Sequence, residues 1–185
     1  MRQSTATASS IQNLLDLERY PLDRLDAPAG RALIEGCRRD LAERGMFSLK
    51  GPVRPATLAR CIEEMMPASE WAPFWHKRQH KICFRKEVPG LAADHPALGI
   101  HETSHATICA DQFPECMVCQ IYEWPAMADF LARTMDKSAL CTMADPIARV
   151  NVMASGHGET LNWQFDRSEF TTTLMLQSPD AAAGG

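Results

Sequence analysis

Residues 101–105 read His-Glu-Thr-Ser-His and match the HExxH pattern of zinc hydrolases. On a helix, this spacing places two histidines one turn apart as zinc ligands, and the glutamate acts as general base. That chemistry requires a helix from about residue 100 to 110. The central Thr-Ser pair and the nearby Gly99 favour a loop or strand instead, and no third ligand follows at a suitable spacing. A zinc hydrolase using His101, Glu102 and His105 is one alternative, and ordinary surface or packing histidines are the other.

Cys116 and Cys119 form a CxxC pair, one of the spacings that occurs in zinc and redox sites. A zinc site needs two further ligands, and a redox pair needs a strand-to-helix context. The flanking residues show no clear version of either. The chain has seven cysteines, an odd number, and no secretory signal. We therefore expect a reducing, cytoplasmic location, with most of the cysteines acting as small core residues.

Residues 71–86 mix aromatic and basic side chains, a composition that suggests nucleic-acid binding. The alternative is a strand or loop whose aromatic side chains pack inward while the charged groups stay in water. Lysine and arginine number 19 against 23 acidic residues, so the formal net charge is −4. Because this charge gives no general attraction for nucleic acid, we favour the second interpretation and predict no nucleic-acid partner.

The most specific motif is Trp-Gln-Phe-Asp at residues 163–166, which precedes Phe170 and an apolar run ending in Leu-Gln at 176–177. It resembles the Fe(II)/2-oxoglutarate-dependent dioxygenases, in the subgroup where a strand ending in Trp-His-Phe-Asp carries the His-x-Asp half of the iron site. The segments 122–125 and 130–132 are also similar to that subgroup. The resemblance covers most of the chain from about residue 94 onward.

This resemblance implies an oxidoreductase that uses Fe(II) and 2-oxoglutarate to hydroxylate a small molecule, or to carry out a related C–H oxidation. Residues two apart on a strand share a face, so Gln164 and Asp166 can both reach one metal. Asp166 matches a family ligand, but Gln164 stands where the family has histidine, and a neutral amide binds iron more weakly than imidazole. Asn151 is implied as a cofactor-binding residue. No catalytic residue is assigned.

The family's second histidine and its 2-oxoglutarate-binding arginine would lie beyond residue 185, so we expect an incomplete barrel with impaired activity. His157 is a candidate replacement ligand, although its Gly-His-Gly surroundings favour an exposed turn. A non-catalytic binding or scaffold protein on the same fold is a further alternative. An incomplete sheet would also have an unpaired edge, which would favour self-association.

The elements that must position these residues follow from periodicity. Helical spacing predicts helices at Pro28–Arg44, at 55–66 with Pro67 ending the second, and at 125–137. Alternation predicts strands at 46–49, 147–153, 160–166 and 169–177. Helices first and antiparallel strands later indicate an α+β fold. By the resemblance, its strands belong to a partial double-stranded β-helix, or jelly roll.

Length and hydropathy define the broad organisation of the chain. Its 185 residues, 45% of them hydrophobic, fit a single domain at 11–185 that follows a disordered terminus at 1–10. No apolar run reaches the roughly 18–20 residues that cross a membrane, so we predict no membrane partner.

Overall fold

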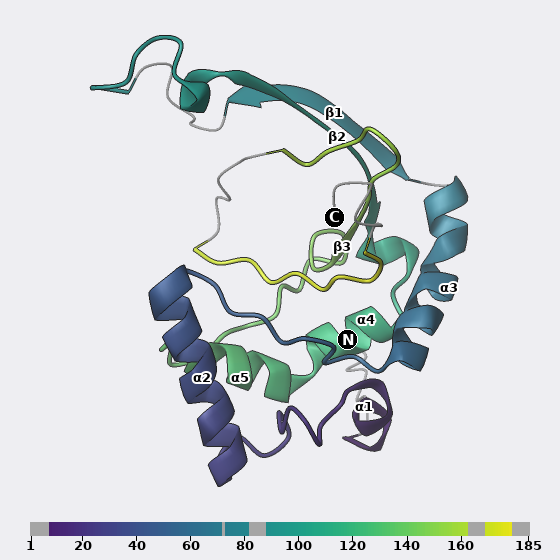
Figure 1. Cartoon of the computed structure of the whole chain (residues 1–185). Helices are drawn as coiled ribbons and strands as arrows, with labels where there is room; N and C mark the ends of the chain where they lie inside the picture. Colours follow the sequence, from purple (N-terminus) through teal and green to yellow (C-terminus); the bar gives the residue numbers. More distant parts are fainter. Residues whose placement is uncertain (1–7, 72, 82–87, 163–168, 179–185) are drawn as a thin grey trace. The chain divides into compact units, whose positions relative to one another are not determined.

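The structure is a computed structural model that describes residues 8–71, 73–81, 88–162 and 169–178. It mixes helices with a three-stranded sheet, which confirms the α+β class (Figure 1). The described chain divides into two compact units, and each is built from two separate segments. The helical unit comprises the residues up to Met66 and Cys109–Val150, and the sheet unit comprises Pro67–Ile108 and the residues from Asn151 onward.

The helical unit contains α1 (Ala8–Leu14), α2 (Pro28–Arg44), α4 (Met117–Glu123), α5 (Pro125–Thr134) and most of α3 (Pro55–Trp71). Helix α2 has the bounds expected from the sequence. Pro28 occupies its first turn, where a missing N–H costs nothing. Gly45 ends it at φ 72° and donates its N–H to the carbonyl of Leu41. Helix α2 packs against α5, and α4 contacts both α1 and α5.

Three expectations for this part of the chain were wrong. Helix α1 begins at Ala8, inside the terminus that was expected to lack structure. Pro67 lies within α3 rather than ending it, because its fixed φ is compatible with a helix even though one backbone hydrogen bond is lost. Residues 46–49 form no strand. Phe47 instead packs edge-on against Phe130 of α5, with ring centroids 6.0 Å apart.

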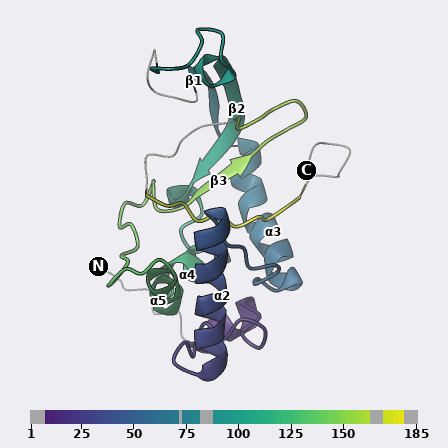
Figure 2. The same cartoon turned by 60° about the vertical axis from the view of Figure 1, so that its left-hand side comes forward.

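The sheet unit contains β1 (Phe74–Lys81), β2 (Ile100–Cys109) and β3 (Asn151–Ala154) in the order β1-β2-β3. Figure 2 shows β3 beside β2. Strands β1 and β2 are antiparallel, and their register places Phe74 opposite Thr107. The expected inward packing of the aromatic residues here was wrong, because Phe74 and Trp75 are 66% and 63% exposed.

Of the strands expected near the C-terminus, the one at 147–153 is shorter and the one at 169–177 is absent, while most of the one at 160–166 lies outside the described residues. The carboxylate of Asp145 accepts hydrogen bonds from the amides of Ile147 and Ala148 at 2.8 and 3.0 Å, and this turn delays the strand until residue 151. Thr160 forms a single bridge with Ser104. No strand is formed at residues 169–178, so the strand predicted at 169–177 was wrong.

Apolar burial is concentrated in the helical unit, for example at Ile11, Leu22 and Phe130. Among the described residues of the sheet unit, only Ala106 and Ile108 are buried apolar side chains. None of the described helices has the length and the apolar character needed to cross a membrane.

Candidate functional site

The His-Glu-Thr-Ser-His segment forms part of strand β2, so the helix required by the zinc hydrolase hypothesis is not formed. Four residues of strand separate His101 from His105 by about 13 Å along the backbone, whereas one helical turn separates such residues by about 5–6 Å. These two histidines therefore cannot chelate one zinc ion as the HExxH motif does. The described residues also contain no group of three or more potential metal ligands. The prediction of a zinc hydrolase that uses His101, Glu102 and His105 was wrong.

The strand register instead forms two cross-strand histidine pairs on one face of the sheet. His76 lies opposite His105, and His80 lies opposite His101. The rings of His76 and His105 stack with their centroids 5.2 Å apart. His105 is buried, and its Nδ1 has no hydrogen-bond partner among the described residues.

Burial lowers the pKa of His105, and electrostatic interactions with His76 and Arg78 on β1 lower it further. Glu159 acts in the opposite direction but does not reverse the shift. His105 is therefore a neutral imidazole near pH 7.

Between the two histidine pairs, the fully buried Thr103 connects β1 to the chain beyond β3. Its hydroxyl donates to the carbonyl oxygen of Leu161 at 2.7 Å. The hydroxyl oxygen of Thr103 also lies 2.7 Å from Nε2 of His80. A hydroxyl has one proton, and a carbonyl can only accept, so Nε2 of His80 must donate to Thr103. This hydrogen bond requires a proton on Nε2 of His80.

Residues 160–162, here called the lead segment, are held along β2 by further hydrogen bonds. Ser104 and Thr160 exchange backbone hydrogen bonds of 2.9 and 3.1 Å. Asn162 donates from its side-chain amide to the carbonyl of Glu102 at 3.2 Å. The His-Glu-Thr-Ser-His segment thus fixes the residues that immediately precede the Trp-Gln-Phe-Asp motif.

The turn before the lead segment is also attached to β2. One carboxylate oxygen of Glu159 accepts a hydrogen bond from the hydroxyl of Ser104 at 3.2 Å. The other accepts a hydrogen bond from the amide of Gly156 at 2.7 Å. One carboxylate therefore closes the turn and joins it to the strand. His157 lies exposed within this turn.

The predicted metal ligands Gln164 and Asp166 lie outside the described residues. Asn151, the predicted cofactor-binding residue, is the exposed first residue of β3. The sequence analysis missed the histidine pairs and the Thr103 connection. A signal was present, because both strands carry two histidines four residues apart, but the register between them cannot be read from a single sequence.

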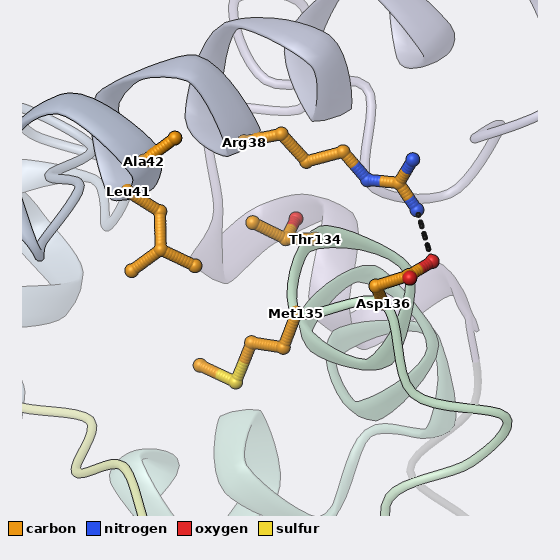
Figure 3. A pocket seen from close by; sticks show the side chains of 6 residues that line it. All are labelled: Arg38, Leu41, Ala42, Thr134, Met135 and Asp136. Atoms are coloured by element: carbon orange, nitrogen blue, oxygen red, sulfur yellow. Dashed lines mark hydrogen bonds and ion pairs between the residues drawn. The ribbon is translucent and has the colours of Figure 1, made fainter.

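A separate open pocket of about 370 Å³ lies in the helical unit between α2 and α5 (Figure 3). Its only described cation, Arg38, donates twice to the carbonyl of Arg133 and forms an ion pair with Asp136 at 3.4 Å. Arg38 therefore satisfies the C-terminal end of α5, and the pocket shows no chemistry beyond that contact.

Comparison of this chain with protein-family models, curated proteins and solved structures finds no match.

Proposed function

We propose that the chain is an Fe(II)/2-oxoglutarate-dependent oxygenase-like protein, with its sheet forming part of a double-stranded β-helix. The observation that supports this proposal most directly is the lead segment on β2. Three consecutive residues are held by Glu102, Thr103 and Ser104, and the next four residues are the Trp-Gln-Phe-Asp motif. In this proposal, β2 fixes the point from which the motif begins.

The ligands in this proposal are Asp166 and Gln164, with Asn151 contributing to cofactor binding. Iron(II) oxygenases use two imidazoles and one carboxylate. The donor set at 164 and 166 therefore fits Fe(II) only in part, because it offers one carboxylate and one neutral amide. Bound iron and 2-oxoglutarate would supply the oxidation of a C–H bond in a small-molecule substrate. In this proposal, the chain itself would hold the carboxylate and the amide on one strand face.

The glutamine at position 164, where the family has histidine, also favours a second candidate function. This function is a non-catalytic binding or scaffold protein on the same fold. The two functions differ in whether the existing carboxylate still binds a metal. Anaerobic Fe(II) titration of the parent chain and of Asp166→Ala separates them. We expect weak binding by the parent and a loss of binding in Asp166→Ala.

The variant Gln164→His provides the sharper test, because imidazole restores one nitrogen ligand at the matched position. We expect it to bind Fe(II) more tightly than the parent. The matched control is Gln12→His, which adds an imidazole at an exposed position of α1, outside the proposed site. Equal affinities of the parent and Gln164→His would contradict the assignment of position 164.

A further inference from the structure

Of the four buried cysteines described in the helical unit, three form a cluster: Cys61 of α3, Cys116 immediately before α4, and Cys119 within α4. The sulfur atoms of Cys116 and Cys119 are 3.8 Å apart. The two residues are only 5% and 1% exposed. The flanking sequence showed no clear context for this CxxC pair, but the structure places it across the start of a helix. A disulfide requires a sulfur–sulfur distance of about 2.05 Å, so a modest side-chain movement would join them.

The two thiols are chemically unequal. The hydrogen bond between the two sulfur atoms lowers the pKa of Cys116 to about 7, against the opposing effects of burial and Glu64. The backbone amides of Val118 and Cys119 also lower the pKa of Cys116. The same hydrogen bond and burial raise the pKa of Cys119. Cys116 is therefore the more acidic thiol of the pair, and Cys119 is the one that holds its proton more strongly.

Arg149 supplies a positive charge beside this pair. It acts on Cys119 by lowering its pKa, and its guanidinium donates to the carbonyl of Pro114 at 3.2 Å and pairs with Glu123. Its Nε is buried and has no hydrogen-bond partner among the described atoms. This charge would stabilise negative charge on Cys119 when its thiol loses a proton.

We propose that Cys116 and Cys119 are a reversible oxidation site, in which a small hydroperoxide converts the neighbouring thiols into a disulfide. The burial of both sulfurs favours a small oxidant over a bulky disulfide. This site lies in the helical unit and is independent of the proposed oxygenase function.

The reaction has two steps. The Cys116 thiolate attacks one peroxide oxygen, so that an S–O bond forms, the O–O bond breaks, and the leaving oxygen takes a proton to become an alcohol, or water when the oxidant is hydrogen peroxide. Cys116 is then a sulfenic acid. The Cys119 sulfur loses its proton and attacks the Cys116 sulfur, and the released hydroxide takes up a proton and leaves as water. Two thiols are oxidised, and the peroxide accepts both electrons.

Cys61 provides a matched control within the same cluster. It is fully buried, and burial together with Cys116 and Glu64 raises its pKa to about 11. Because the thiolate is the reactive form of cysteine, Cys61 should remain reduced while the pair oxidises.

The test treats the reduced full chain with hydrogen peroxide, quenches it in denaturant containing N-ethylmaleimide, and maps the cysteines by tandem mass spectrometry. We expect a Cys116–Cys119 disulfide that dithiothreitol reverses. Cys61→Ser should form this disulfide at a rate within about twofold of the parent. Cys119→Ser should stop at the sulfenic acid of Cys116, which dimedone captures.

Two outcomes would overturn the proposal. One is that Cys116 and Cys119 both still react with N-ethylmaleimide after peroxide has oxidised the exposed Cys141. The other is that the first disulfide joins a different pair, such as Cys61 and Cys116. Both outcomes are read from the parent chain, so neither depends on whether a variant folds.

Discussion

At the scale of single residues, the hydroxyl of Thr103 connects two strands to the lead segment. Replacing Thr103 with valine keeps the shape but removes both hydrogen bonds, leaving the Leu161 carbonyl and the Nε2–H of His80 without this partner. A hydrogen bond contributes about 0.5–1.5 kcal/mol net, so the loss of two costs about 1–3 kcal/mol. We therefore expect Thr103→Val to lower the free energy of unfolding by that amount, measured by urea denaturation.

The matched control for this substitution is Thr107→Val, which makes the same change on the same face of β2 at a half-buried position. We expect a much smaller effect there. If the two variants lost equal stability, the cost would come from the hydroxyl-to-methyl change itself rather than from the Thr103 connection.

His105 gives a second prediction at this scale, a dependence of stability on pH. Its pKa is lowered in the folded state, while an unfolded histidine titrates near about 6.5. Below pH 6.5 the unfolded chain therefore binds more protons, so the free energy of unfolding falls as the pH decreases, by at most about 1.4 kcal/mol per pH unit. His105→Gln should flatten this slope in urea denaturation curves between pH 5 and 7.

The groups that act on His105 are His76 and Arg78 of β1 and Glu159 of the turn after β3. His157 in that exposed turn provides the control, and His157→Gln should keep the parental slope. An unchanged slope in His105→Gln would show that other groups cause the pH dependence.

At the scale of elements, two glycines of α2 predict opposite effects of the same substitution. A Cβ at Gly30 would lie 2.5 Å from the carbonyl oxygen of Arg24 and 2.6 Å from the Cα of Leu25, both backbone atoms that cannot move aside alone. At Gly36, the nearest atom is a side-chain nitrogen of Arg39 at 3.9 Å. We expect Gly30→Ala to lower the free energy of unfolding by about 1–3 kcal/mol. Gly36→Ala should raise the free energy of unfolding by about 1 kcal/mol, because alanine has the higher helix propensity. Thermal denaturation of both variants measures this difference, and a stabilised Gly30→Ala would contradict the close approach.

The helices also show which features a sequence can predict. Pro28 and Gly45 act through local backbone geometry, so the bounds of α2 follow from the sequence alone. The strands depend on partners that are distant in the chain, and the alternating residues 46–49 have no neighbouring strand among the described residues. The same limit applies to the candidate site, because His76 meets His105 through register. The zinc interpretation failed for a related reason, since its spacing has chemical meaning only on a helix.

At the scale of the molecule, the two units bury apolar surface very unequally. The helical unit contains most of the large buried side chains, whereas the described sheet unit buries Ala106 and Ile108 together with the polar Thr103 and His105. Large apolar side chains such as Phe74, Trp75 and Ile100 remain exposed there. We propose that this exposed apolar surface, together with any unpaired edge of the sheet, favours self-association.

Unequal burial also predicts unequal local stability, because opening a segment that buries little apolar surface costs less free energy. We expect the amides of β2 to exchange with deuterium through openings of lower free energy than the amides of α2, which contributes Ile34 and Cys37 to the buried core. Native-state hydrogen exchange read by mass spectrometry measures both elements in one sample, and dilution of the protein separates this effect from protection by self-association. The helix α5 provides an internal reference, since it packs on α2 and should share its protection. Equal protection of β2 and α2 at low protein concentration would show that the two units unfold together as one cooperative body, in spite of their different cores.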